Sequence, residues 1–580
     1  MQSTGQRAVW DRVRRTVPTL PLRTADVTIA HRGENQISAA STPSATLGSF
    51  DYVIVGAGSA GCVLANRLSA DPDVRVLLLE AGGPDDYFWI PIPLGIFKTI
   101  GNPRTDWCFT SEPEPGLNGR AVRIPRGKVL GGSSSINGMI HIRGQARDFD
   151  RWRALGNAGW GWEEVLPFFR RSEDFLRGAD AVHGAGGEWR VEELRTRWEI
   201  LDAFRDAAAQ VGIASSEDFN RGDNDGCGYA HVNQTRGVRL NTARAFLRPA
   251  MQRPNLRVLT HAHVNSLRFE GRRAVGVEYR HGGTLGRAGA SCEVILAAGA
   301  IGSPQMLQLS GIGPAALLRK RGVEVRHDLP GVGENLQDHL QVRMVCKVRN
   351  TATINERASS LVGRLGMGLE YFLFKRGPLT MVPPQMCCFT RSNPSHETPN
   401  VQYLVMPMSF DAFADGPHPF PAFTAAMCTL RPASRGHVRI KGPDAQAHPA
   451  IVHNYLASEE DQRTAVESMR IARRIAAAPA LAGFAPEEFR PGPQARSDAD
   501  LLGFARDNGT TVFHPVGTCK MGNDAMAVVD DRLRVRGVAG LRIVDASIMP
   551  TLTSGNTQAP IIMIAEKACD MIRSDRCDGA

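Results

Sequence analysis

The chain has 580 residues, of which 42% are hydrophobic and 22% charged, and its formal net charge is +9. This length exceeds one ordinary hydrophobic core, so we expect two or three packed units built in part from separated segments. The longest apolar runs fall short of the roughly 18 residues of a membrane span. The 68 basic and 59 acidic residues are scattered without a basic block among aromatic residues. That pattern argues against a nucleic-acid partner and allows at most peripheral membrane contact.

The first 49 residues differ from the rest of the chain. They hold scattered Arg, Ser and Thr but no hydrophobic segment typical of a secretory signal. A disordered arm, a transit-like leader and a wrongly chosen start codon all fit this composition. The 11 cysteines form no C-x-x-C pair, which indicates a reducing compartment, and no metal site is predicted. We therefore expect a cytoplasmic protein, with peripheral contact at the inner membrane as the alternative.

Residues 51–80 predict a nucleotide-binding βαβ unit. A short apolar run is followed by a glycine-rich turn, a helix and a second apolar run that ends in Glu80. The first glycine permits the tight turn, the second lets the backbone approach a pyrophosphate at the helix N-terminus, and the third lets the helix pack on the sheet. Glu80 is expected to bind a ribose 2′-hydroxyl, which disfavours a 2′-phosphate. The fingerprint residues, which do not distinguish NAD from FAD, are Gly56, Gly58, Ser59, Ala60 and Gly61.

Loops, helices and a hairpin are expected next along the chain. Residues 91–106 and the glycine-dense residues 123–143 predict loops wrapped over a ligand. Helical periodicity covers residues 149–175 and 199–211, whereas residues 256–279 alternate like a hairpin.

The rest of the chain predicts a second sheet and a return to the first unit. Residues 291–299 form a buried strand ending in glycine, which we expect beside the first strand. Residues 340–510 show strands with many Pro and aromatic residues, typical of a substrate-facing sheet with its helices. Residues 541–572 predict a strand, a loop and a helix that complete the nucleotide domain.

A second nucleotide fingerprint is missing from the middle of the chain. Gly331-Val-Gly333 lacks a strand-to-helix context, and Gly311-Ile-Gly313 runs into Pro314, so both predict turns. A reductase that takes electrons from NAD(P)H through a flavin usually needs that second fingerprint. One tightly held dinucleotide and an external electron acceptor therefore fit better.

Three further segments carry a family resemblance. They are Gly127-Lys-Val-Leu-Gly-Gly-Ser-Ser-Ser-Ile-Asn137, Gly299-Ala-Ile-Gly-Ser-Pro-Gln-Met-Leu-Gln-Leu-Ser-Gly-Ile-Gly313 and His514-Pro-Val-Gly-Thr-Cys-Lys-Met-Gly522. With the fingerprint, they resemble the signature segments of the glucose–methanol–choline (GMC) oxidoreductases over about residues 50–572. The likeness is closest to the bacterial alcohol and choline dehydrogenase-like flavoproteins, and it implies FAD rather than NAD.

The resemblance also implies the fold and its division. The expected fold is α/β, with a doubly wound FAD-binding domain of Rossmann type and an interleaved substrate-binding domain built on an antiparallel sheet. The predicted regions are an arm (1–49), an FAD-binding region (50–340) with substrate-domain insertions near 150–245, a mainly substrate-binding region (341–510), a C-terminal segment completing the FAD domain and active site (511–572) and a tail (573–580).

Cofactor contacts follow from the resemblance residue by residue. Beyond the fingerprint and Glu80, it implies FAD contacts at Val129, Gly132, Ser133, Asn137, Gly138, Met139, Ile140, Val264, Asp545, Ala546, Asn556, Thr557 and Gln558. Some family members attach FAD covalently through a histidine at the position of Ile136. Because isoleucine cannot form that bond, we expect non-covalent FAD.

His514 is the candidate catalytic base. Hydride leaves an alcohol carbon readily only when a base removes the hydroxyl proton, and an imidazole titrating near neutrality suits that role. The resemblance implies that hydride goes to flavin N5, and it places Asn556 opposite His514, where the amide orients the substrate oxygen. His339, in Asn335-Leu-Gln-Asp-His339, is given a structural role.

Two residues are assigned to the substrate pocket, Gln385 and Phe513. Many relatives carry a glutamate where this chain has Gln385, and in choline-oxidising members that acid faces the cationic substrate. A neutral side chain cannot offset the desolvation of a quaternary ammonium. The neighbours of Gln385 suggest an apolar pocket: Met381, Val382, Pro383, Pro384, Met386 and Phe389. His141, where relatives usually have an aromatic residue, has no explanation from the sequence.

The resulting hypothesis is an FAD-dependent dehydrogenase that oxidises a primary alcohol to an aldehyde and passes electrons to a quinone-like acceptor. A choline dehydrogenase and an O₂-using alcohol oxidase of the same family are the first alternatives. A flavin-containing lyase of the hydroxynitrile lyase type, or a light-driven decarboxylase, is the alternative from another class, since the fold alone does not decide the reaction. The oligomeric state is left open.

Overall fold

The computed structural model describes residues 46–413 and 415–578. Most of the predicted arm, residues 1–45, lies outside this part of the chain. Residues 46–49 instead begin the first strand, β1 (Thr46–Val55), because this end of the strand pairs with Arg287 and Gly289 of a neighbouring strand. At the other end, the helix α13 (Gln558–Asp578) continues through most of the predicted tail.

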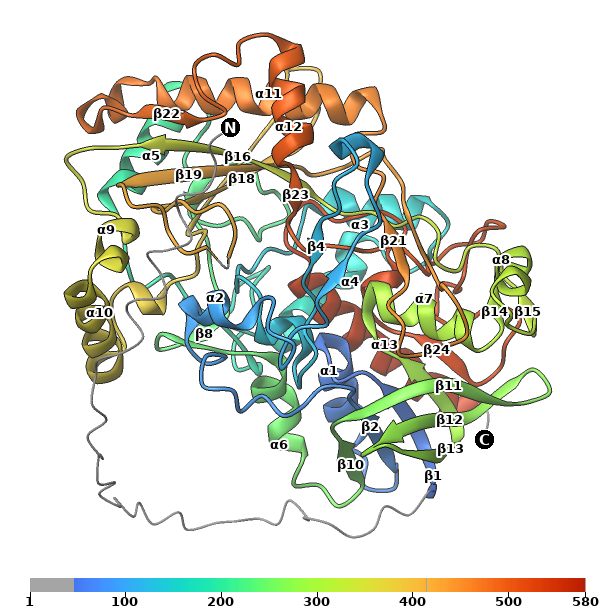
Figure 1. Ribbon diagram of the computed structural model, residues 1–580. Coiled ribbons are helices and arrows are strands. Elements are labelled where there is room, and N and C mark those ends of the chain that lie inside the picture. The colour runs from blue at the N-terminus through green and yellow to red at the C-terminus, as the bar shows by residue number, and fades with distance from the viewer. Residues whose placement is uncertain (1–45, 414, 579–580) are drawn as a thin grey trace, which may run out of the picture. The chain divides into compact units, whose positions relative to one another are not determined.

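The nucleotide-binding unit is built on a mixed sheet with the order β10-β2-β1-β13-β12-β11, and β24 pairs with β13 (Figure 1). The bounds of these strands are Leu256–Leu259 (β10), Val76–Leu79 (β2), Thr284–Leu296 (β13), Arg273–His281 (β12), Ala262–Glu270 (β11) and Leu541–Ile543 (β24). The predicted strand at 291–299 does lie parallel to β1, with Val55 opposite Leu296. Strand β24 of the C-terminal segment joins this sheet, where it pairs in parallel with β13.

The hairpin predicted at 256–279 is shorter and shifted. β11 and β12 form it, but β10 pairs in parallel with β2 at the other side of the sheet. Alternation of apolar residues identifies a strand without identifying its partner, which explains the difference.

The second sheet is antiparallel, as expected, with the order β22-β16-β19-β18-β17-β7 and β23 beside β16. Its strands are Glu487–Arg490 (β22), Leu340–Lys347 (β16), Ala422–Thr429 (β19), Val401–Met406 (β18), Met386–Thr390 (β17), Gly226–Tyr229 (β7) and Thr510–Thr511 (β23). Helices α5 (Glu199–Gln210), α11 (Glu459–Ala476) and α12 (Asp498–Asn508) lie beside it at the top of Figure 1.

The helical pattern at 149–175 forms two helices, α3 (Ala146–Ala154) and α4 (Trp162–Ser172), instead of one. Gly156 and Gly159 between them adopt φ values of +92° and +80°, which a helix cannot accommodate. Residues 173–175 leave the helix as a short strand. The helix predicted at 199–211 is confirmed as α5.

Short elements connect these units. The remaining helices are Ser59–Leu68 (α1), Ile96–Thr99 (α2), Arg248–Ala250 (α6), Gly299–Leu309 (α7), Ala315–Lys320 (α8), Ile354–Ser359 (α9) and Leu361–Phe374 (α10). The remaining strands are Phe109–Thr110 (β3), Arg123–Ile124 (β4), Glu173–Phe175 (β5), Trp189–Val191 (β6), Gln234–Thr235 (β8), Val238–Arg239 (β9), Ile312–Gly313 (β14), His327–Asp328 (β15), His437–Arg439 (β20) and Ala450–Val452 (β21). β14 occupies the predicted turn at 311–313, where it pairs with β15.

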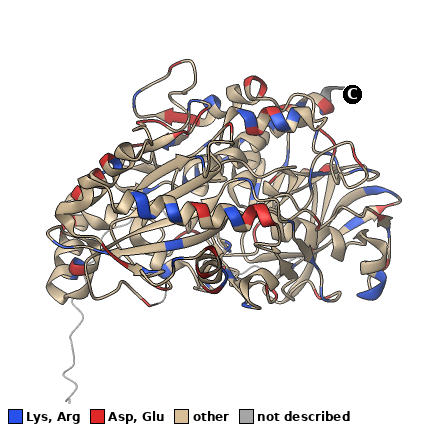
Figure 2. Ribbon diagram, turned by 90° about the horizontal axis from the view of Figure 1, so that it is seen from above, with Lys and Arg blue, Asp and Glu red and all other residues tan. Residues whose placement is uncertain are grey.

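On the face of the molecule that is seen from above, basic and acidic residues are interspersed, without a large block of one sign (Figure 2). Within residues 46–413 and 415–578, the helices are too short or too polar to cross a bilayer.

Candidate functional site

One cavity is lined by residues of both sheets. The nucleotide unit contributes the β1–α1 turn, the end of β2, the loop around residues 126–140 and the start of α7. The antiparallel sheet contributes Gln341 and Arg343 of β16 and Leu404 and Met406 of β18. A ligand in this cavity therefore contacts segments far apart in the chain, which is the arrangement expected where a cofactor meets its substrate.

The glycine-rich turn has the geometry that its sequence predicts. Gly56 has φ +101°, and a Cβ there would lie 2.6 Å from the carbonyl oxygen of Ala297. A Cβ on Gly61 would lie 1.9 Å from the carbonyl oxygen of Gly56. Gly58, in contrast, has only one atom within 4 Å of a Cβ position, at 3.9 Å, and it lines the cavity. The turn thus keeps open space in front of the N-terminus of α1, where a pyrophosphate would lie.

Glu80 lies at the end of β2 with its carboxylate turned back to the turn. It accepts hydrogen bonds from the backbone N–H groups of Ala57, at 2.8 Å, and Gly82, at 2.7 Å. Burial raises the pKa of this carboxyl to about 7, although the two hydrogen bonds act in the opposite direction. A ribose hydroxyl that donates to the same carboxylate would compensate for part of this burial.

Most of the predicted cofactor residues line this single cavity. They are Gly56, Gly58, Ser59, Ala60, Glu80, Gly132, Ser133, Asn137, Gly138, Met139, Ile140, Val264, Asp545, Ala546, Asn556, Thr557 and Gln558. Gly61 and Val129 are not among the lining residues. Gly61 is held behind the turn, and Val129 forms a β-bridge with Gly83. These two residues therefore lie in the packing behind the cavity wall, and not at the cavity surface as predicted.

Several polar groups at the cavity fit a dinucleotide. Helix α1 begins at Ser59 after the N-cap residue Gly58, without a side-chain cap or an acidic residue in its first turn, so its first N–H groups are available to an anion. Gln558, at the N-terminus of α13, accepts a hydrogen bond from Ser59 at 3.0 Å, and its buried Nε2 has no partner among the described residues. An unpaired buried amide is costly, and a ligand atom that accepts from this Nε2 would remove that cost.

The loop that carries His514 is held rigidly from behind. The backbone N–H of His514 donates to Asp338 at 2.8 Å, and the N–H of Phe513 donates to the hydroxyl of Thr511 at 2.7 Å. Arg126 donates to the carbonyl oxygen of Phe513 at 2.6 Å. Phe513 itself has φ +74°, an unfavourable conformation for a large side chain. These contacts hold Phe513 and His514 at the cavity wall.

A chain of hydrogen bonds sets the tautomer of His514. Nε2 of His339 lies 3.0 Å from the carbonyl oxygen of Leu430, which can only accept, so His339 carries its proton on Nε2. Nδ1 of His339 is then an acceptor, and it lies 3.0 Å from Nδ1 of His514. His514 must donate from Nδ1, which leaves a lone pair on its Nε2. Asn556 places its Nδ2 3.2 Å from that Nε2.

The surroundings keep His514 neutral. Burial lowers its pKa well below the ordinary value, and the neighbouring His339 and Arg126 lower it further. Burial also lowers the pKa of His339. The structural role predicted for His339 is thus more specific, since this residue directly determines which nitrogen of His514 can accept a proton.

The antiparallel sheet contributes residues that sequence reasoning missed. Gln341 and Arg343 line the cavity from β16, and Gln402 of β18 donates to Asn556 Oδ1 at 3.4 Å. The period-2 pattern of residues 341 and 343 was the available signal, but it does not tell which face of a strand meets a ligand. Arg126, in the loop before the signature segment, was also missed.

Arg343 is a cation without an acidic partner among the described side chains. It donates to the backbone oxygen of Asp411 at 3.3 Å, and its guanidinium lies 4.7 Å from the ring centre of Phe410. Burial lowers its pKa to about 10. The acidic residues that line the cavity are Glu80 and Asp545, both of them hydrogen-bonded to backbone N–H groups of the nucleotide unit.

Gln385 does not line the cavity, in contrast to its predicted place in the substrate pocket. It lies before β17, fully buried, and both polar atoms of its side chain lack partners among the described residues. Its neighbours Pro383 and Pro384 do line the cavity, whereas Met381, Val382, Met386 and Phe389 lie in the core of the second sheet. The chain turns into β17 at this point, so the following side chains pack inside the sheet.

His141 also lies away from the cavity. Its Nε2 is 3.3 Å from Glu173, whose other oxygen accepts from Arg143 at 2.7 Å. The unusual histidine at position 141 therefore belongs to a buried polar cluster with Glu173 and Arg143, outside the cavity.

Comparison with known proteins decides the family. The GMC oxidoreductase models match residues 50–341 and 432–565. The chain belongs to the GMC oxidoreductase family. It is 42% identical over 527 residues to an alcohol dehydrogenase (acceptor) from Pseudomonas putida, covering 90% of this chain and 95% of the relative. It is 41% identical over 534 residues to an oxygen-dependent choline dehydrogenase from Photobacterium profundum, covering 90% and 93%.

The fold of this GMC oxidoreductase is shared with solved structures. An FAD-dependent oxidoreductase from Chaetomium thermophilum superposes with a TM-score of 0.83 at 27% identity, covering 91% of this chain and all of that one. Proteins of this family are FAD-binding flavoproteins, and the open turn, the α1 N-terminus and Gln558 fit that cofactor. The chain is thus an enzyme of the GMC family with alcohol and choline dehydrogenases among its relatives.

Proposed function

We propose that this enzyme is an FAD-dependent dehydrogenase that oxidises an uncharged primary alcohol to an aldehyde, with His514 as the base. The observation that carries the proposal is the hydrogen-bond chain from Leu430 through His339 to His514. It leaves the lone pair of His514 Nε2 beside Asn556 at the cavity wall. A neutral imidazole held in this tautomer is suited to accept a hydroxyl proton.

The chain's own residues divide the chemistry between them. FAD, when bound, supplies the acceptor for the hydride that leaves the alcohol carbon. His514 accepts the hydroxyl proton at Nε2, and Asn556 Nδ2 is placed to donate to the alcohol oxygen. His339 accepts from His514 Nδ1 throughout, so the proton can enter only at Nε2. The fingerprint turn, Glu80 and Gln558 hold the cofactor without a covalent bond, since Ile136 occupies the position used for attachment in some relatives.

The charges around the cavity favour an uncharged alcohol over choline. Arg126 and Arg343 line the cavity, and neither forms an ion pair within residues 46–413 and 415–578. A quaternary ammonium would be desolvated beside these guanidinium groups without a carboxylate to compensate. Phe410, Phe413, Leu404 and Met406 offer apolar contacts instead. The physiological electron acceptor is proposed to be a quinone or a similar external molecule.

Anaerobic reduction of the enzyme-bound flavin tests this proposal. With hexan-1-ol as substrate, His514→Ala should slow flavin reduction by about 10²- to 10⁴-fold, the usual contribution of a general base, while the FAD content is unchanged. A matched control is His396→Ala, which alters a partly exposed histidine outside the cavity. Unchanged reduction by the His514 variant would contradict the mechanism. A flavin that no alcohol reduces would favour a lyase.

A further inference from the structure

Helix α10 exposes an apolar face to solvent. Leu361, Leu365, Leu369 and Phe372 recur at spacings of three and four residues, so they share one side of the helix. Met367 and Tyr371 are buried on the opposite side. The exposed fractions of the large apolar residues of α10 are 73% for Leu361, 81% for Val362, 61% for Leu365, 63% for Leu369, 52% for Phe372, 67% for Leu373 and 65% for Phe374.

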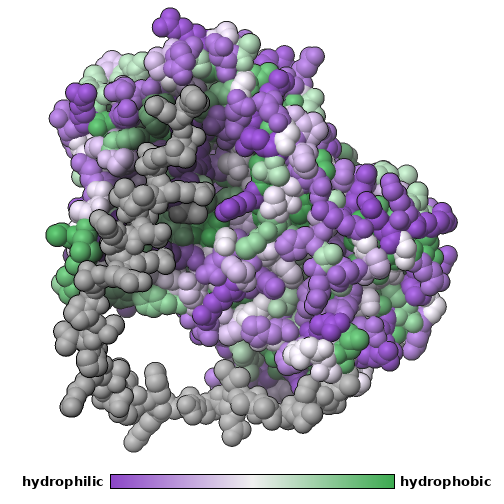
Figure 3. Space-filling model, in the orientation of Figure 1, coloured by the Kyte–Doolittle hydropathy of each residue, from purple (hydrophilic) through white to green (hydrophobic). Residues whose placement is uncertain are grey.

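This concentration is not a general feature of the surface. Among the described residues, 12 large hydrophobic side chains are strongly exposed, and seven of them lie on α10. An eighth, Phe88, stacks on Phe372 with ring centres 6.0 Å apart. In Figure 3 a green patch marks the left edge of the view, at the place of α10 in Figure 1. Scattered exposed leucines need no explanation, but a contiguous patch of this kind marks an interaction surface.

Basic side chains adjoin the apolar face. Arg364 lies within α10, and Lys375 and Arg376 follow its last turn. Within the described part of the chain, none of these three forms an ion pair with an acidic side chain. Arg376 also lines a hollow beside the helix, together with Arg195, Arg197 and Arg357 and only two acidic residues, Glu199 and Glu370. The edge of the apolar face is therefore positively charged and suited to anionic headgroups.

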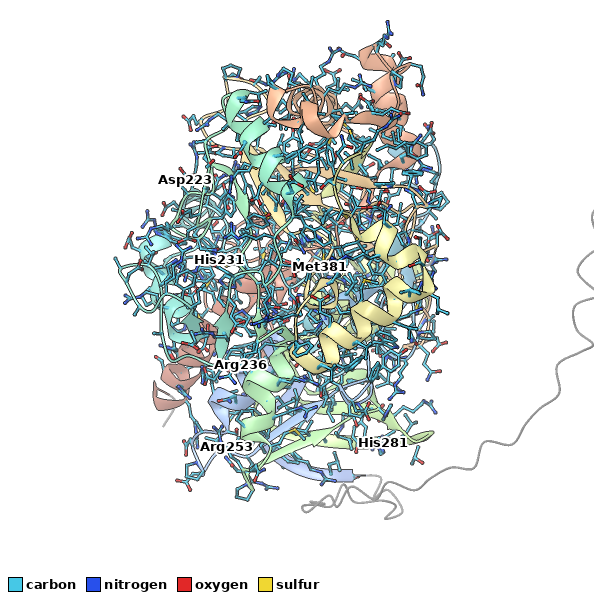
Figure 4. All side chains as sticks on the ribbon, turned by 90° about the vertical axis from the view of Figure 1, so that its left-hand side faces the viewer. Asp223, His231, Arg236, Arg253, His281 and Met381 are labelled. Carbon is cyan, nitrogen blue, oxygen red and sulfur yellow. The ribbon has the colours of Figure 1, made fainter. Side chains whose placement is uncertain are left out.

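The helix is also connected to the catalytic cavity. The chain leaves α10 at Lys375 and reaches Pro383 and Pro384, which line the cavity, within nine residues. α10 itself lies on the face turned toward the viewer in Figure 4. The segment that follows α10 thus runs directly to the wall of the cavity.

We propose that α10 binds the surface of an anionic phospholipid bilayer, with its apolar face among the acyl chains and its basic residues at the headgroups. The 14 residues of α10 span about 21 Å, less than the roughly 30 Å hydrocarbon core, so the helix lies in the interface. A second copy of the chain is a less suitable occupant, because a symmetric contact would bring the same unpaired basic residues together. A bilayer would supply both apolar contact and opposite charge.

Sedimentation with vesicles tests this proposal on the FAD-loaded enzyme. The protein should bind vesicles of phosphatidylcholine that contain 30% phosphatidylglycerol (about one lipid in three, for a clear surface charge). It should dissociate from these vesicles as the salt concentration rises. Leu365→Ser with Leu369→Ser should weaken binding about tenfold or more, because two exposed anchors are lost. Lys375→Glu with Arg376→Glu should weaken it on anionic vesicles. Leu285→Ser, an exposed leucine on a hairpin, is the matched control.

Oxidation of a water-soluble alcohol with a soluble dye acceptor should be unchanged in all these variants, which shows that each has folded. The proposal is overturned if the native enzyme does not bind anionic vesicles, or if the serine variant still binds them. It is also overturned if the native enzyme is a dimer without vesicle binding and the serine substitutions give monomers, since the face would then belong to a second copy.

Discussion

Nδ1 of His339 lies 3.0 Å from Nδ1 of His514, although 175 residues separate the two in the chain. Because the other nitrogen of His339 donates to a carbonyl oxygen, His339 can only accept from His514. This pairing leaves the acceptor lone pair of His514 on Nε2, 3.2 Å from Nδ2 of Asn556 at the cavity wall.

Replacing His339 by Phe should slow flavin reduction by about tenfold or more, because His514 can then adopt the wrong tautomer. Replacing it by Gln, whose amide oxygen can accept from Nδ1, should restore part of the rate. Stopped-flow reduction under anaerobic conditions measures both. Equal losses in the two variants would show that His339 acts only through packing.

The lowered pKa of His514 predicts an unusual acid limit for the reaction. Its neutral form is the active base, and a pKa well below the ordinary value keeps that form present as the pH falls through the normal range of histidine. The kcat/KM for an uncharged alcohol should therefore stay constant from pH 8 to about pH 6. A decline centred near the ordinary histidine pKa, about 6.5, would show that the base is solvated as in a free imidazole.

Glu80→Gln should weaken FAD binding by about tenfold, since one charge-assisted hydrogen bond to the ribose is lost. The Glu80→Gln variant, once saturated with FAD, should oxidise alcohol at the rate of the native enzyme. Fluorescence titration of the cofactor-free protein measures the affinity. Glu270→Gln, at an exposed position outside the cavity, is the control. Equal affinities in both variants would remove Glu80 from the cofactor site.

Arg343→Leu should raise the preference for choline over hexan-1-ol, measured as the ratio of their kcat/KM values, by about tenfold. A unit charge at about 10 Å from the substrate cation is worth roughly 1 to 2 kcal/mol at an effective dielectric constant near 20. Arg349→Leu, an exposed position just beyond β16, serves as the control. An unchanged ratio would mean that the guanidinium does not face the substrate.

Local patterns predicted the parts of the site that follow one another in the chain. The run from Tyr52 to Glu80 was sufficient for the strand, turn and helix, since the positive φ of Gly56 and the contact of Gly61 with the carbonyl oxygen of Gly56 are local requirements. The signature segment beginning at His514 likewise pointed to the histidine and to its cavity. The buried strand at 291–299 was recognised because both of its faces are apolar.

Tertiary packing decided which residues meet. A period-2 pattern shows that Gln341 and Arg343 share a face, but only the pairing of β16 with β19 turns that face toward the cavity, while Gln385 is buried instead. The tautomer of His514 depends on a carbonyl oxygen at Leu430, and the exposure of α10 depends on which side of the helix the core covers. The sequence alone thus determined the family and the chemical groups, because motifs record local backbone requirements. The assembled fold decided their hydrogen-bond partners and contacts, because these arise between segments that are distant in the chain, such as His339 and His514, which are 175 residues apart.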